Sequence, residues 1–246
     1  MKKQNSPSAE KSTIRHPRLG EVLVVHSRQA RRISLSVKMN GTVRLSCPHS
    51  LSVQEGLRFL EEKVPWVEQT RERLALRYPK ERIEMPFSTR SHVLRLLPGD
   101  VPAISARITG GEIRVSYPAM LPYADEQVQS IIRKGIEAAW RIEANAFLPG
   151  RTEELARQTG LKYGKINVRN TVSKWGSCSA RNDISLSLHL MRLPDHLIDY
   201  IILHELCHTV HHNHGPRFHA LLDQLTEGRH GALRGEIRRY RIRWGD

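Results

Sequence analysis

Residues 204–219 read HELCHTVHHNHGPRFH, and this stretch decides how the rest of the chain is interpreted. It opens with a His-x-x-x-His pattern, His204 and His208, on a segment whose apolar spacing predicts a helix. Residues four apart on a helix differ by about 40° around the axis and by about 6 Å along it, so both imidazoles can reach one ion. Glu205 projects from a neighbouring direction, where it can take a proton from water. The spacing therefore predicts a metal site with an adjacent general base.

A zinc site of the catalytic kind needs a third protein ligand and an open position. His211 and His212 lie roughly 10–12 Å along the axis from His204, too far for ligands that must all lie about 2 Å from one ion. On an unbroken helix His214 would lie about 120° off the shared face. His214 can therefore serve as the third ligand only if the helix ends before it.

The sequence supplies such an ending at residues 213–216, Asn-His-Gly-Pro. Asn or Gly can adopt the left-handed conformation that closes a helix, and Pro can start the next one. We therefore predict His204, His208 and His214 as ligands of Zn²⁺ and Glu205 as the catalytic residue. The other histidines of the stretch are interpreted as a solvated helix end, and Cys207 as a small core residue.

Composition excludes several classes of protein. The 246 residues are 39% hydrophobic and 26% charged, which is ordinary for a globular chain, and no apolar run approaches a membrane span. The first residues lack the apolar core of a secretory signal. Three scattered cysteines do not form a disulfide framework, so we expect a reducing, cytoplasmic location. The net charge of +14, of which +10 falls in residues 1–120, favours encounters with anionic partners without identifying them.

Periodicity along the chain predicts an α+β protein. We expect a disordered tail over residues 1–18, a β-rich region with one long helix over 19–120, and a third region over 121–246. The alternating stretch around Asn40-Gly41 predicts a hairpin, and Ser52 with Glu55 predicts a capping box. The expected helices cover 53–78, kinked at Pro65, then 123–147, 153–159, and a span from about 195 to 210. The expected later strands cover 92–97, 103–109, 112–117, 165–169 and 184–190, with a loop over 173–180.

A second motif lies in that loop, where residues 174–179 read KWGSCS. Together with the following strand, the His-Glu-Leu-Cys-His segment, Asn213-His214 and Phe218, it resembles the YgjP-like predicted zinc metallopeptidases, which are related to SprT-like proteins. Upstream, residues 27–37 (SRQARRISLSV), Asn40-Gly41, Pro48 and residues 63–66 (KVPW) resemble the same family. The resemblance covers roughly residues 20–230.

The resemblance implies a minimal zincin-like core over 121–246, with His204, His208 and His214 at the family's metal positions and Glu205 as its catalytic glutamate. It also implies that residues 175–179 lie near the active-site helix. From this we expect Lys174, Trp175, Gly176, Ser177 and Arg169 to contact substrate. The chain departs from the family at residues 209–212 and in its Arg-rich end, 234–243, which leaves the substrate open.

The expected activity is metal-assisted hydrolysis, in which Glu205 accepts a proton as water attacks. Donors that could stabilise the developing oxyanion are Lys174, Arg169, Asn170, His211 and His212. We expect a peptide as the first substrate class. Three alternatives remain open: a hydrolase of an anionic small molecule such as a nucleotide phosphoanhydride, a nucleic-acid-associated SprT-like protease, and a non-catalytic zinc module. No sequence motif supports nucleic acid as a partner, and no membrane partner is expected.

Overall fold

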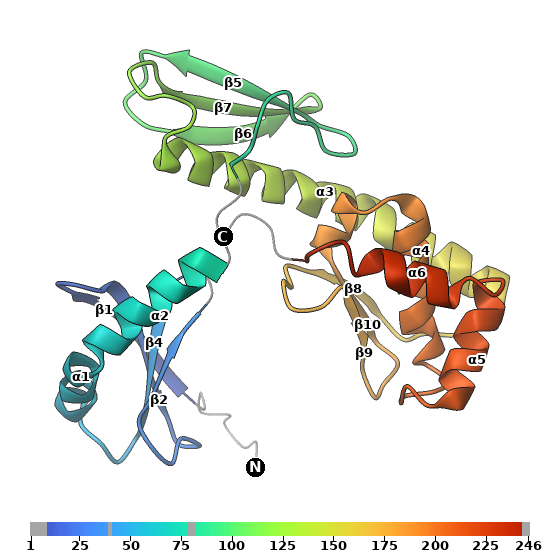
Figure 1. Cartoon of the computed structure of the whole chain (residues 1–246), viewed down its shortest axis with the longest axis horizontal. Helices are drawn as coiled ribbons and strands as arrows, with labels where there is room; N and C mark the ends of the chain where they lie inside the picture. The colour runs from blue at the N-terminus through green and yellow to red at the C-terminus, as the bar shows by residue number, and fades with distance from the viewer. Residues whose placement is uncertain (1–8, 39–40, 78–81, 243–246) are drawn as a thin grey trace, which may run out of the picture. The chain divides into compact units, whose positions relative to one another are not determined.

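The computed structural model describes residues 9–38, 41–77 and 82–242. The chain divides into two compact units, residues 1–80 and residues 81–245, and each is described by itself (Figure 1). Both units combine helices with small mixed sheets, which confirms the α+β class. Within the described ranges, no helix combines the length and the apolar character needed to cross a membrane.

The first unit is a four-stranded sheet covered by two helices. Its strands are β1 (Ala9–His16), β2 (Gly20–Ser27), β3 (Ser34–Val37) and β4 (Val43–Pro48), in the order β1-β2-β4-β3, with β2 and β4 parallel. The antiparallel β3–β4 pair confirms the expected hairpin, although Asn40 lies outside the described residues. Helix α1 (Val53–Glu62) starts with the expected capping box, because Ser52 and Glu55 each accept the other's backbone N–H. A core of aliphatic side chains lies between sheet and helices.

Two features of this unit differ from the sequence-based expectation. Residues 9–16 of the expected tail form β1, which pairs with β2 along its whole length, while residues 1–8 lie outside the described part. The expected single helix is two, because α1 ends at Glu62 and α2 (Val64–Arg77) begins just ahead of Pro65. Proline is tolerated in a first helical turn, where its missing N–H has no partner, so the chain starts a new helix there instead of bending one.

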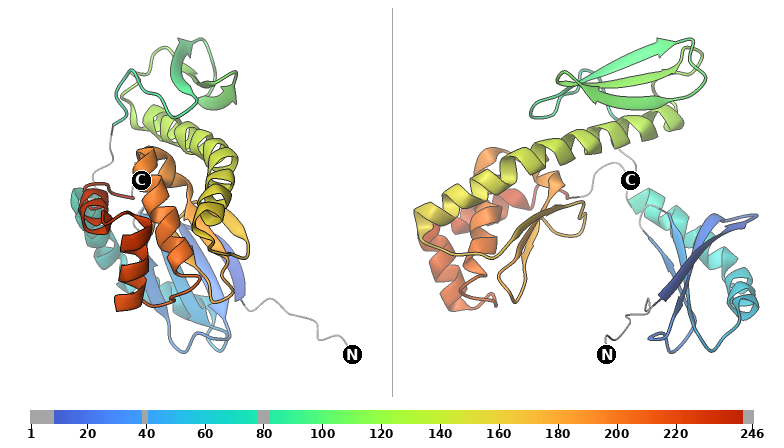
Figure 2. Two further views of the ribbon diagram at one scale, coloured as in Figure 1. Left: turned by 90° about the vertical axis from the view of Figure 1, so that its right-hand side faces the viewer. Right: turned by 180° about the vertical axis from the view of Figure 1, so that it is seen from behind.

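The second unit begins with a sheet of three strands on a long helix. The sheet consists of β5 (Val93–Gly99), β6 (Ser105–Thr109) and β7 (Glu112–Pro118). It packs against α3 (Glu126–Thr159), which runs along the sheet and extends well beyond it (Figures 1 and 2). A Cβ atom at Gly135 of α3 would lie 2.9 Å from Cγ2 of Ile113, so glycine permits this close approach. The sheet and α3 thus belong to one unit, and the chain divides near residue 80, not at the expected boundary near 120.

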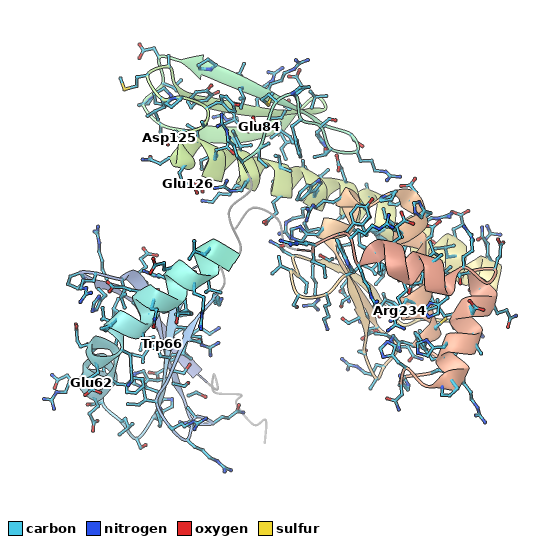
Figure 3. All side chains as sticks on the ribbon, viewed as in Figure 1. Glu62, Trp66, Glu84, Asp125, Glu126 and Arg234 are labelled. Carbon is cyan, nitrogen blue, oxygen red and sulfur yellow. The ribbon has the colours of Figure 1, made fainter. Side chains whose placement is uncertain are left out.

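Helix α3 is continuous where the sequence predicted two helices. Asp125 caps its first turn (Figure 3), and Gly160, with φ of 70°, ends it as expected. The expected break after residue 147 is wrong, because the helix continues through Pro149. Buried side chains on both sides of the proline, Leu148 and Leu155, keep the two parts packed in the core.

The rest of the second unit follows α3. Strands β8 (Ile166–Arg169), β9 (Gly176–Cys178) and β10 (Ile184–Ser187) form a sheet in the order β8-β10-β9, and β9 occupies part of the expected 173–180 loop. A 3₁₀ turn, η1 (Leu188–Arg192), leads to α4 (Asp195–Cys207), α5 (Pro216–Leu225) and α6 (His230–Ile237). The buried side of this sheet, α3 and α4 share one apolar core, which fixes α4 beneath β9. Arg234 on α6 (Figure 3) is exposed, as expected of a solvated helix face.

Candidate metal centre

Three imidazole nitrogens converge at the end of α4. Nε2 of His214 lies 3.1 Å from Nε2 of His208 and 3.1 Å from Nε2 of His204. All three ligand atoms lie within 4.8 Å of one another, and the described residues contain no other comparable group of histidine, cysteine and carboxylate side chains. Bonds of 2.0–2.1 Å at the tetrahedral angle would place two ligand nitrogens about 3.4 Å apart. The observed separations therefore suit a single tetrahedral ion.

The backbone brings His214 back to α4 by ending the helix early. Helix α4 ends at Cys207. Beyond it, the amides of Thr209 and Val210 bond three residues back, to the carbonyls of Leu206 and Cys207. Helix α5 then begins with Pro216 in its first turn, which confirms the predicted restart, whereas α4 ends at Cys207, ahead of the predicted stop at residues 213–216. The predicted left-handed cap is wrong: Gly215 has φ of −82°. Successive tight turns after Cys207 reverse the chain instead.

A buried aromatic ring packs against all three imidazoles. The ring centroid of Phe218, which is fully buried, lies 4.9 Å from that of His204, 4.5 Å from that of His208 and 4.8 Å from that of His214. Nδ1 of His208 donates a hydrogen bond to the backbone carbonyl of His211 at 3.0 Å. The other ring nitrogen, Nε2, therefore carries the lone pair that can bind a metal ion. These contacts hold the rings in orientations from which their Nε2 atoms can bind metal.

Burial favours the neutral form of two of the three imidazoles, those of His204 and His208. Burial, with a smaller contribution from the neighbouring histidines, lowers the pKa of His204 to about 3. Burial also lowers the pKa of His208, against the opposing effect of its bond to His211. Because a histidine binds metal only as the neutral imidazole, the donor set fits a divalent cation at neutral pH.

Glu205 lies beside the cluster on the core side of β9. Its side chain is buried, and its Oε2 atom has no hydrogen-bond partner within the described part of the chain. Burial raises its pKa to about 7, and the nearby charge of Lys174 opposes that rise. A Cβ atom on Gly176 would lie only 2.7 Å from Oε1 and from Cγ of Glu205, so β9 lies directly against the carboxylate.

The expected substrate-contacting residues are divided between two environments. Gly176 lies against Glu205, whereas Ser177 follows it on the strand and faces the opposite side of the sheet. Arg169, Lys174 and Ser177 line a separate cavity on that opposite side. Trp175 is half-buried against the core.

Of the expected oxyanion donors, Asn170 is occupied elsewhere. Its Oδ1 accepts from Nε2 of buried His189 at 2.9 Å, and its Nδ2 donates to Glu137 at 2.6 Å. His211 contributes its backbone carbonyl to the centre, and the His212 side chain is exposed.

A second polar network, which the sequence did not predict, lies beside the three imidazoles. The hydroxyl of Tyr200 lies 3.3 Å from Nδ1 of His230, and Nε2 of His230 lies 3.3 Å from Nδ1 of His219. The rings of Tyr200 and His204 have centroids 6.4 Å apart, as do those of His219 and His214. His219 therefore belongs to a network and is not merely part of a solvated helix end. Tyr200, one helical turn before His204, was a local signal, but nothing in the sequence pointed to His230.

A known family model matches most of the chain. Residues 31–232 match the family model described as YgjP-like, metallopeptidase domain. A search of curated proteins finds no match. Among solved structures, the metallopeptidase zymogen of Methanocaldococcus jannaschii jannalysin is similar with a TM-score of 0.34 and 22% identity, over 37% of this chain and 93% of that one. The family match includes both the converging histidines and the strand beside Glu205, and the chain belongs to the YgjP-like family of metallopeptidase domains.

Proposed function

We propose that this protein is a zinc-dependent peptidase with a minimal zincin-like core, in which His204, His208 and His214 hold the metal and Glu205 is the general base. The single observation that carries the proposal is the convergence of three imidazoles beside a buried carboxylate with one free oxygen: Nε2 of His214 lies 3.1 Å from Nε2 of His208 and 3.1 Å from Nε2 of His204. A structural zinc site usually closes its fourth position and needs no base, so an unpartnered carboxylate favours a catalytic centre.

Bound zinc would supply Lewis acidity and would lower the pKa of a coordinated water towards about 7. The chain's own contribution is proton transfer at Glu205. A base works best when its pKa is near the working pH, and burial places the pKa of Glu205 at about 7. Its free Oε2 atom can accept a proton from the attacking water and return it to the leaving amine.

The surroundings keep this carboxylate in place. Gly176 confines it on the β9 side, and the core around α4 excludes bulk water from it. Lys174 is the cation that acts on Glu205 electrostatically, and we assign it the stabilisation of developing negative charge. The cytoplasm remains the expected location, on the evidence of cysteine usage.

Two substitutions test the proposal. Glu205→Gln should retain one zinc per chain and lose peptide hydrolysis by at least about 10²-fold, because an amide cannot take the proton. His214→Ala should lose tight zinc binding, which metal analysis after dialysis against a chelator measures. Full hydrolysis by Glu205→Gln would refute the general base, and unchanged zinc content in His214→Ala would refute the third ligand. A panel of peptides and nucleoside triphosphates decides between peptidase and phosphoanhydride hydrolase.

A further inference from the structure

On the side of β9 and β10 away from Glu205 lies a cavity of about 260 Å³. Two cations and four hydroxyl-bearing side chains line it, together with the backbone of Gly176: Arg169, Lys174, Thr171, Ser177, Ser185 and Ser187. Since a water molecule takes roughly 30 Å³ in the liquid, the cavity can hold a small ligand. No acidic side chain is among the residues that line it.

The strand register explains why these groups share one face. Ser185 pairs with Ser177 across β9 and β10, and Ser187 pairs with Arg169 across β10 and β8. Side chains alternate along a strand, so Leu186, between the two serines, points into the core, where it is fully buried. The sheet therefore has one apolar face and one hydroxyl-lined face.

The polar groups of the cavity are fixed in place but largely unused. The Ser187 hydroxyl donates to the backbone carbonyl of Thr171 at 2.6 Å, which holds the loop before β9 over the sheet. Across residues 9–38, 41–77 and 82–242, no carboxylate forms an ion pair with Arg169 or Lys174, and the hydroxyls of Ser177 and Ser185 have no hydrogen-bond partner. Two unneutralised cations beside free donors make a site for negative charge.

We propose that this cavity binds an oxyanion, the phosphate or carboxylate group of a small ligand. The Arg169 guanidinium can donate two parallel hydrogen bonds to such a group, Lys174 adds a second positive charge, and the serine hydroxyls complete its coordination. The site is separated from Glu205 by the thickness of one strand. It requires neither zinc nor peptidase activity, so it goes beyond the proposed function and can be tested independently of it.

The experiment is calorimetric titration of the metal-loaded protein with inorganic phosphate and, in a second arm, with acetate. We expect saturable 1:1 binding that weakens as NaCl is added, and the anion that binds more tightly identifies the group. Arg169→Gln and Lys174→Gln should each weaken binding about 10-fold, as expected for the loss of one charge-assisted contact. Arg181→Gln is the matched control, since Arg181 is 89% exposed in the β9–β10 connection and does not line the cavity.

A second kind of variant protects the test against misfolding. Ser185→Asp places a carboxylate in the cavity while leaving both cations in place, and it should abolish binding; thermal unfolding confirms that each variant is folded. Absence of saturable binding of either anion by the wild-type protein would overturn the proposal. Equal binding by the wild-type protein, Arg169→Gln and Lys174→Gln would place the anion outside the cavity and would also overturn the proposal. Loss of binding on addition of a chelator would do the same.

Discussion

Gly176 should be required for activity because of how closely β9 approaches Glu205, the proposed general base. In Gly176→Ala the new methyl carbon would lie 2.7 Å from Cγ and Oε1 of Glu205 and 2.9 Å from its Cδ atom. Carbon atoms in good contact are about 3.5–4.0 Å apart, so the carboxylate or the strand must move by about 1 Å. The carboxylate is buried, so it cannot swing into solvent without disturbing the core.

The size of the effect follows from that displacement. A misplacement of about 1 Å in a catalytic group can cost about 10²-fold in rate, which corresponds to about 3 kcal/mol of transition-state stabilisation. Overpacking should also lower the free energy of unfolding by about 1–3 kcal/mol. Zinc content should be unchanged, because no ligand lies among the atoms that the methyl group meets.

The assay is cleavage of a peptide mixture followed by mass spectrometry, with kcat corrected for the folded, zinc-loaded fraction. Gly231→Ala is the matched control, since a Cβ atom there meets nothing within 4 Å, and it should retain wild-type activity. A Gly176→Ala protein that is folded, binds zinc and keeps kcat within twofold of wild type would show that Glu205 does not need its observed position.

Two further predictions concern the surroundings of the site. Burial lowers the pKa of His189 to about 4. Between pH 6.5 and pH 4 the unfolded state therefore binds more protons than the folded state. As the pH is lowered from 6.5 to 4, the free energy of unfolding should fall by roughly 2–3 kcal/mol. Urea unfolding of His189→Gln should lack that part of the pH dependence; an identical slope in both proteins would refute the assignment. Phe218→Leu removes the ring that packs on the three imidazoles. Chelator competition should show that the affinity for zinc is reduced by about 10-fold or more. Unchanged affinity would mean that the ring does not orient the three histidines.

Local features of the structure could be predicted from the sequence because they rest on short-range geometry. The spacing of His204 and His208 acts within one helical turn, and Pro216 starts the next helix as predicted. The structure brings both imidazoles together with that of His214. The capping box of Ser52 and Glu55 is another such case. The left-handed cap was wrong because several kinds of turn can end a helix, and the packing of the next helix decides among them.

Other features could not be predicted because they depend on contacts between distant residues. Pro149 is a helix breaker by local rules, yet α3 passes through it because its flanking residues are buried in the core. Strand β1 is almost entirely exposed, with Ile14 and His16 as its inward-facing residues, so it lacks the alternating apolar pattern of a strand. The approach of Gly176 to Glu205 joins residues 29 positions apart and is visible only in three dimensions.

The strand β9 connects these observations, because its two faces have different chemistry. One face presents a glycine to Glu205, the proposed general base, and a larger residue there would displace the carboxylate. The opposite face presents Ser177 to a cavity lined by two cations, to which Lys174 contributes from the preceding loop. Lys174 also acts electrostatically on Glu205, so its charge is shared by both sites. If an oxyanion binds in the cavity, its negative charge will partly offset that of Lys174, so hydrolysis by Glu205 should depend on anion concentration. In Lys174→Gln that dependence should shift to about 10-fold higher anion concentration, because binding is weaker by that factor.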